Sequence, residues 1–167
     1  MPRVRKDGPL RALFIGRNEM RKGFDLLLQA MPRVSGPVEW EVVGPFDAVE
    51  AGAVRPHFHG EIRSRSRLME IVDGADVLVV PSRAEGMPTV ILEALARGCH
   101  VIATDVGATA ELLADAPGCR LIAPDVDELV TALDAFAANP PSPRAFDLDR
   151  FTWPRVAEDH LRLFERL

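Results

Sequence analysis

Short apolar runs alternate with amphipathic stretches along most of this 167-residue chain. The expected strands are residues 10–15, 38–43, 54–59, 76–80, 100–104 and 119–123. The expected helices between and after them are residues 24–31, 67–72, 88–97, 109–114 and 126–138. This alternation predicts an α/β fold: a Rossmann-like three-layer sandwich with a mostly parallel sheet and helices on both faces. Such sheets bind ligands beyond the carboxyl ends of their strands.

Composition and breaker residues indicate how the chain is divided. With 47% hydrophobic and 27% charged residues, it suits one globular domain with a sizeable core, predicted to span residues 1–138. The proline-rich stretch that starts at Asn139 predicts a linker over residues 139–150. A terminal helix is expected within 151–167, beginning near Trp153.

The net charge of −5 argues against a non-specific nucleic-acid binder, which ordinarily carries a basic stripe. The densest basic cluster, Arg63, Arg65 and Arg67, is short and is interpreted as a solvated helix start. No apolar run approaches the ~20 residues that span a membrane, and no secretory signal is recognisable, so we expect a cytoplasmic protein. Cys99 and Cys119 fit no metal-ligand spacing and are expected to be buried free thiols.

The segment 81–98 carries the most specific chemistry. It follows the apolar run 76–80 directly, as a loop and then a helix. Pro88 suits the first helical position, which would leave the amides of Thr89 and Val90 free to donate to a phosphate. Helical side chains lean toward the N-terminus, so the Glu93 carboxylate points back toward that ligand and can accept hydrogen bonds from sugar hydroxyls.

This segment resembles the paired-glutamate signature of retaining glycosyltransferases of family 4, whose fold is called GT-B. Seven residues separate Glu85 from Glu93, as in that signature. Pro-Ser before the first glutamate, Gly after it, and Leu-Glu-Ala-Leu-Ala-Arg-Gly around the second are typical of the donor-binding half of the family. The resemblance covers residues 10–167 and implies the C-terminal half of a GT-B fold, whose last helix, at residues 151–167, packs back toward the amino-terminal domain.

A second constellation follows the first expected strand, in the loop from Gly16 to Gly23. The resemblance implies that Arg17 and Lys22 hold the donor diphosphate. Two fixed cations would stabilise the charge on a departing diphosphate without a metal; the alternative is a merely solvated loop. A dinucleotide-binding Gly-x-Gly-x-x-Gly loop is absent here, and a phosphate-receiver domain would need acidic residues where Arg17 stands.

The resemblance implies catalytic roles for Glu85, Arg17 and Lys22, with no cofactor and no metal, and no Asp-x-Asp pair occurs near the site. The expected donor-binding residues are Gly16, Arg17, Lys22, His59, Gly60, Ile62, Glu85, Gly86, Met87, Pro88, Thr89, Val90 and Glu93.

Structural alternatives stay open for three of these features. Glu93 could instead form an ion pair with Arg97 on a solvated stripe that begins at Thr89. His59 is as readily a structural histidine as a base contact. The loop 105–109 matches one that rims the cleft in the family, although helix initiation explains it equally.

Two departures from the family are visible. Only a turn fits between Gly44 and Val54, where relatives carry a helix, so one edge or face of the sheet is expected to be less covered. The amino-terminal acceptor domain is missing, which suggests half an enzyme: an excised piece, a natural fragment or a split-enzyme subunit. The leading hypothesis is therefore a nucleotide-sugar-binding domain of a retaining glycosyltransferase, inactive without its other half.

The alternative is a non-catalytic nucleotide-sugar sensor or interaction module. Peripheral attachment to the inner membrane through the missing half also stays open. The base, the sugar and the acceptor are not predicted.

Overall fold

A single parallel sheet organises the protein, whose computed structural model describes residue 5 and residues 7–49 and 51–165. The strand order is β3-β2-β1-β4-β5-β6. The strands are β1 (Leu10–Ile15), β2 (Val38–Val43), β3 (His57–Phe58), β4 (Val77–Val80), β5 (His100–Thr104) and β6 (Arg120–Ile122). The α-helices are α1 (Phe24–Ala30), α2 (Arg65–Gly74), α3 (Thr89–Ala96), α4 (Thr109–Leu113), α5 (Val126–Ala138) and α6 (Trp153–Phe164). Three 3₁₀ turns are η1 (Met20–Lys22), η2 (Met31–Arg33) and η3 (Asp149–Phe151).

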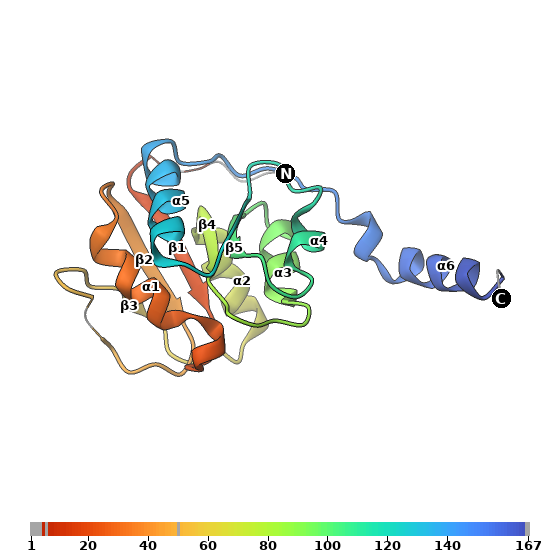
Figure 1. Cartoon of the computed structure of the whole chain (residues 1–167), viewed down its shortest axis with the longest axis horizontal. Coiled ribbons are helices and arrows are strands. Elements are labelled where there is room, and N and C mark those ends of the chain that lie inside the picture. Colours follow the sequence, from red (N-terminus) through yellow and green to blue (C-terminus); the bar gives the residue numbers. More distant parts are fainter. Residues whose placement is uncertain (1–4, 6, 50, 166–167) are drawn as a thin grey trace.

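Helices cover both faces of this sheet, as the apolar pattern predicts (Figure 1). On one face, α1 and α5 pack against alternate strand residues such as Phe14 and Trp40. On the other face, α2, α3 and α4 pack against residues of the opposite parity such as Leu13 and Leu78. The two apolar clusters lie on either side of β1, so the three-layer Rossmann-like prediction is confirmed.

The middle of the sheet matches the expected bounds, whereas its β3 edge differs. Residues 10–15, 38–43 and 100–104 form strands over their whole predicted lengths. The expected strand 54–59 contracts to β3, because Val54 pairs with Ala51 across a tight turn instead of joining the sheet. Within the described residues 44–49 and 51–56 there is no helix, as predicted.

Helix α2 is longer than expected, and the reason lies at its start. Ser64 precedes the first helical residue, and its side-chain oxygen accepts a hydrogen bond from the Arg67 amide. This N-cap begins the helix two residues earlier than the apolar pattern indicates. Arg63, Arg65 and Arg67 are all exposed around this start, so the interpretation of the basic cluster as a solvated helix start is confirmed.

The C-terminal helix α6 begins at Trp153, as predicted, and projects away from the body of the molecule (Figure 1). Trp153 is 86% exposed and Phe164 is 66% exposed. The described segment 139–148 contains neither helix nor strand. The predicted terminal helix extended to Leu167, which lies outside the described residues.

Two further expectations concern membranes and thiols. Among the described residues, no helix combines the length and the apolar character needed to cross a bilayer. Cys99 is buried and forms no disulfide with the other described cysteine, as expected, but Cys119 is only partly buried, which corrects that prediction. Its Sγ accepts a hydrogen bond from the Val101 amide, and burial raises the pKa of the Cys119 thiol to about 11.

Candidate functional site

The site lies where the strand order reverses, at the carboxyl ends of β1 and β4. These two strands are neighbours, yet α1 follows β1 on one face and α3 follows β4 on the other. Their connections therefore diverge and leave a crevice, the usual ligand position in such sheets. A pocket of about 420 Å³ occupies it. Its lining consists of Ile15, Gly16, Arg17, Lys22, Val43, Gly44, Pro45, Glu61, Ile62, Leu68, Glu85, Met87, Pro88, Thr89 and Val90.

The loop after β1 and the loop after β4, which border the crevice, are in direct contact with each other. Gly23 has a φ of +67°, and a Cβ there would lie 1.8 Å from the carbonyl oxygen of Pro81. The Arg83 amide donates to the Arg21 carbonyl at 2.7 Å. The Arg83 guanidinium donates to both Asp25 oxygens, at 2.6 and 2.7 Å, and these hydrogen bonds hold the pKa of Asp25 below its usual value. These contacts fix the position of Lys22 relative to Glu85.

Glu85 is the most buried charged side chain of the pocket, at 6% exposed. Lys22 Nζ donates to its Oε1 at 2.8 Å, and the Ser82 hydroxyl donates to the same oxygen at 2.7 Å. Arg21 approaches the other carboxylate oxygen at 3.8 Å. A carboxylate buried to this degree needs such hydrogen-bonding partners to offset its loss of water.

Arg17 is placed differently from Lys22. Its side chain is 69% exposed and pairs with Glu19 at 3.0 Å, and Glu19 also accepts from Arg21 at 2.7 Å. The loop after β1 therefore carries three cations, of which Lys22 is the most buried and Arg17 the most exposed. Both predicted cations line the pocket, Lys22 at its floor and Arg17 from an exposed position.

The start of α3 faces the pocket with unsatisfied amides. Thr89 is the first helical residue and Pro88 precedes it, which corrects the predicted placement of Pro88 inside the helix. In the described part of the chain, the amides of Thr89 and Val90 have no acceptor, whereas Ile91 donates to the Pro88 carbonyl. A helix start with free amides favours an anion.

The loop after β5 supports the loop that carries Glu85. Gly107 has a φ of +57°, and a Cβ there would lie 2.1 Å from the carbonyl oxygen of Glu85. The Ala108 amide donates to the Gly86 carbonyl at 2.9 Å. Helix α4 does start directly afterwards, so the loop 105–109 both begins a helix and holds the backbone at Glu85 and Gly86.

Glu93 lies one helical turn beyond Thr89 and Val90, outside the residues that line the pocket. It accepts a hydrogen bond from Arg65 at 3.3 Å, and its side chain is 26% exposed. The alternative ion pair with Arg97 is wrong, because Arg97 forms a bidentate pair with Asp73 on α2 instead.

Of the residues expected near the base, one lines the pocket and the others lie beside it. Ile62 lines the pocket, and the neighbouring carbonyl of Gly60 accepts from the Gly44 amide at 3.0 Å. His59 does not line it; its Nε2 lies 2.5 Å from a carboxylate oxygen of Glu41. Gly60 and Gly86 also fall outside the lining, although both are adjacent to residues that form it.

Several contributors were not predicted from the sequence. Those that line the pocket are Ile15, Val43, Gly44, Pro45, Glu61 and Leu68. Two others, Arg21 and Ser82, do not line it but contact the Glu85 carboxylate. A signal was present: apolar runs that end in Gly16 and Gly44 mark two neighbouring strands that finish at the same edge. A Cβ on Gly44 would lie 1.9 Å from the Gly16 carbonyl oxygen, so the two ends are in contact.

The sequence profile described as "Glycosyl transferases group 1" matches residues 9–139. The phosphatidyl-myo-inositol mannosyltransferase of Mycolicibacterium smegmatis is 31% identical over 171 residues, which cover 92% of this chain and 44% of that protein. The sucrose-phosphate synthase of Thermosynechococcus elongatus superimposes with a TM-score of 0.75 at 27% identity, over 95% of this chain and 45% of the other. The Anabaena protein HepE, solved in complex with UDP and glucose, superimposes with a TM-score of 0.66 at 22% identity, over 78% of this chain and 39% of the other.

The parallel sheet, its reversal point and the neighbouring structures define a glycosyltransferase domain of the GT-B class. The chain belongs to the glycosyl transferases group 1 family. It spans about half the length of the curated relatives it matches.

Proposed function

We propose that this chain is the donor-binding half of a retaining glycosyltransferase and that its pocket binds a nucleoside diphosphate sugar. The observation that carries the proposal is the meeting of Lys22, Glu85 and the free amides of α3 in one pocket at the reversal point of the sheet. A cation and helix-start amides suit a diphosphate, whereas a carboxylate suits sugar hydroxyls.

The diphosphate is assigned to the helix-start side of the pocket. Thr89 and Val90 offer two amide donors there, and Lys22 and Arg17 offer positive charge from the facing loop. Charge-assisted hydrogen bonds of this kind stabilise the negative charge that develops on a departing diphosphate. The side chains assigned to this role need no metal ion to balance that charge.

The sugar is assigned to Glu85 and the nucleoside to the β2 side of the pocket. Glu85 accepts from Lys22 and Ser82 through one oxygen, Oε1, while its other oxygen is 3.8 Å from Arg21 and can accept from a hydroxyl. Ile62, Leu68 and Pro45 supply apolar surface for a base. Glu93 would accept from ribose hydroxyls in place of its hydrogen bond with Arg65. HepE, which shares the fold, was solved with UDP and glucose.

Transfer would need a second domain. This chain offers one wall of a cleft, and positioning an acceptor against the donor can supply up to about 7 to 11 kcal/mol of a reaction barrier. Helix α6 carries exposed apolar side chains, including Trp153, Leu161 and Phe164, on a surface suited to such a domain. We expect the chain to bind the donor but to transfer no sugar alone.

Calorimetric titration tests this proposal. Nucleoside diphosphate sugars that carry uracil, guanine or adenine are titrated into the wild type, into Lys22→Ala and into Arg33→Ala as an exposed control. We expect one donor to bind saturably, binding at least about tenfold weaker in Lys22→Ala, and no change in the control. The proposal would be contradicted if none of the three nucleotide sugars bound the wild type saturably, or if Lys22→Ala bound the donor as tightly as the wild type.

A further inference from the structure

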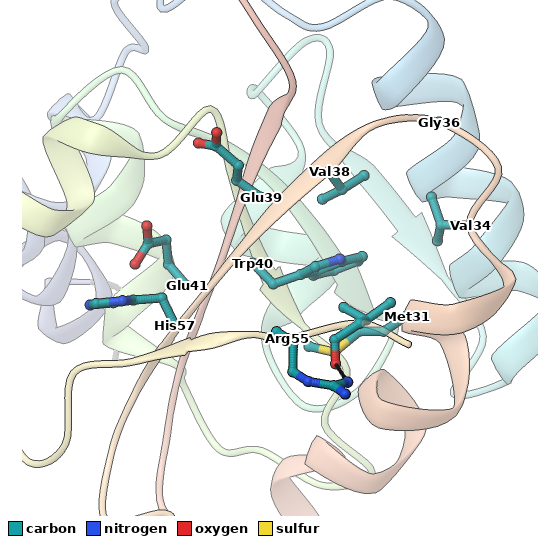
Figure 2. A pocket seen from close by; sticks show the side chains of 10 residues that line it. Met31, Val34, Gly36, Val38, Glu39, Trp40, Glu41, Arg55 and His57 are labelled. Carbon is teal, nitrogen blue, oxygen red and sulfur yellow. Dashed lines mark hydrogen bonds between the residues drawn. The ribbon is translucent and has the colours of Figure 1, made fainter. Parts of the chain in front are cut away.

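Two histidines and a glutamate gather on one face of the sheet at its β3 edge. In the parallel pairing of β2 with β3, Glu41 lies opposite His57. His59 follows two residues later, and its amide donates to the Val42 carbonyl at 2.9 Å, which continues the extended pairing beyond β3. Residues two apart along a strand share a face, so all three side chains project from the same side. Figure 2 shows the Glu41 carboxylate and the His57 ring next to each other, on the side of β2 away from Trp40.

The ligand atoms of these side chains are close together. The His59 Nε2 atom lies 2.5 Å from Glu41 Oε2. The two imidazole rings have centroids 4.5 Å apart. One ligand atom from each of the three residues can be chosen so that all lie within 4.8 Å of one another. In a tetrahedral site with bonds of 2.0–2.1 Å, ligand atoms are about 3.3 Å apart. Sub-ångström to ångström shifts of side chains at a solvent-accessible edge would achieve this spacing.

We propose that Glu41, His57 and His59 bind a divalent transition-metal ion of the Zn²⁺ type. Two imidazole nitrogens and one carboxylate oxygen form the three-protein-ligand set that such ions accept, with water at the fourth position. His57 is exposed, so water can reach the ion. Mg²⁺ and Ca²⁺ prefer oxygen ligands and fit this cluster poorly.

This metal site is separate from the donor pocket. None of its three side chains lines that pocket, and it requires no part of the proposed donor chemistry. A second hollow of about 490 Å³ lies beside it, lined by Glu41, His57 and Trp40 among others (Figure 2). Glu39, two residues before Glu41, adds a second carboxylate on the same face of β2, which favours a cation there.

The ion would cross-link β2 and β3, which pair with each other over only two positions. β3 contains only two residues, and the described part of the connection that precedes it contains no helix. A metal ion bound by β2 and by the residues of the β3 edge would fix this edge and the chain that leads from it to Ile62 in the donor pocket. If the ion binds the folded state and not the unfolded chain, the free energy of unfolding should rise with metal concentration.

The test uses the tag-free chain, titrated with Zn²⁺ by calorimetry and with Co²⁺ by visible absorption. We expect one equivalent to bind, a Tm that rises with Zn²⁺, and a Co²⁺ spectrum with a ligand-field band. His57→Ala, His59→Ala and Glu41→Gln should each weaken binding at least about tenfold.

His160→Ala is the matched control, because His160 is an exposed histidine of α6 outside the cluster. It should bind as the wild type does. His57 is exposed, so its variant remains informative if either of the other two fails to fold. The proposal is overturned if the wild type binds no stoichiometric Zn²⁺, or if His57→Ala binds as tightly as the wild type.

Discussion

The Lys22 ammonium and the Glu85 carboxylate are 2.8 Å apart, so the cation assigned to the diphosphate and the anion assigned to the sugar hold each other. They come from loops after two neighbouring parallel strands, 63 residues apart in the chain. A diphosphate must compete with Glu85 for Lys22, whereas a sugar hydroxyl can still reach the Glu85 oxygen that Lys22 does not bind. Binding of the diphosphate and binding of the sugar are therefore predicted to respond differently when the Lys22–Glu85 pair is broken.

Glu85→Gln should separate these two dependences. Removing the negative charge releases Lys22 for phosphate, so binding of the nucleoside diphosphate should be unchanged or tighter. The amide cannot accept as strongly from a sugar hydroxyl, so the preference for nucleotide sugar over nucleoside diphosphate should fall by about tenfold. Calorimetry with both ligands measures the ratio, with Glu128→Gln, at an exposed position of α5, as the control. An unchanged ratio would remove Glu85 from the sugar site.

Glu93→Ala should weaken nucleotide-sugar binding about tenfold and leave the fold intact, because a charged acceptor contributes on the order of 1.5 to 3 kcal/mol to such hydrogen bonds. Glu93 also binds Arg65, which is 78% exposed, and that exposed contact adds little stability. The control is Glu70→Ala, which breaks a comparable exposed pair with Arg67 on α2. Equal affinities of the two variants, with a lower Tm for Glu93→Ala alone, would assign Glu93 a structural role.

Gly23→Ala should destabilise the protein by more than about 2 kcal/mol, because it combines a positive φ with a backbone contact. The added Cβ would lie 1.8 Å from the Pro81 carbonyl oxygen. The matched control is Gly74→Ala at the end of α2, where nothing lies within 4 Å and stability should rise by up to about 1 kcal/mol. Urea denaturation measures both variants. Similar unfolding free energies would mean that the two loops are not fastened at Gly23.

The Asp25–Arg83 pair should contribute less to the free energy of unfolding in acid than at neutral pH. Arg83 lowers the pKa of Asp25 from 3.8, so the pair stabilises the fold fully above that pH and progressively less as pH falls through the lowered value. The side chains are 37% and 35% exposed, which limits the contribution to about 1 kcal/mol. The stability difference between wild type and Asp25→Asn should therefore be full at pH 6 and should shrink as pH falls below 3.8. A difference that stays constant through this range would assign it to another cause.

Hydrophobic patterning predicted the architecture because the central strands are buried on both faces and read as continuous apolar runs. It failed at β3, where pairing of Val54 with Ala51 depends on the turn between them. For the candidate site, the motif residues Lys22 and Glu85 could be named from the sequence. The partners Ser82 and Arg21 could not, since their contacts arise only when the two loops meet. His59 was expected near the base, but its place beside Glu41 follows from strand register, which the sequence alone did not predict.

The most direct test of the donor-binding proposal is an amide chemical-shift titration of the isotope-labelled chain with the nucleotide sugar that binds best. The proposal predicts the largest shifts at Thr89, Val90 and Gly16, around the free amides of α3 and the end of β1, with smaller shifts near Ile62. In Lys22→Ala the same shifts should need at least about tenfold more nucleotide sugar to reach half of their full size. Saturable binding that leaves Thr89 and Val90 unshifted, or shifts confined to residues away from the crevice between β1 and β4, would contradict the assignment of this pocket as the donor site.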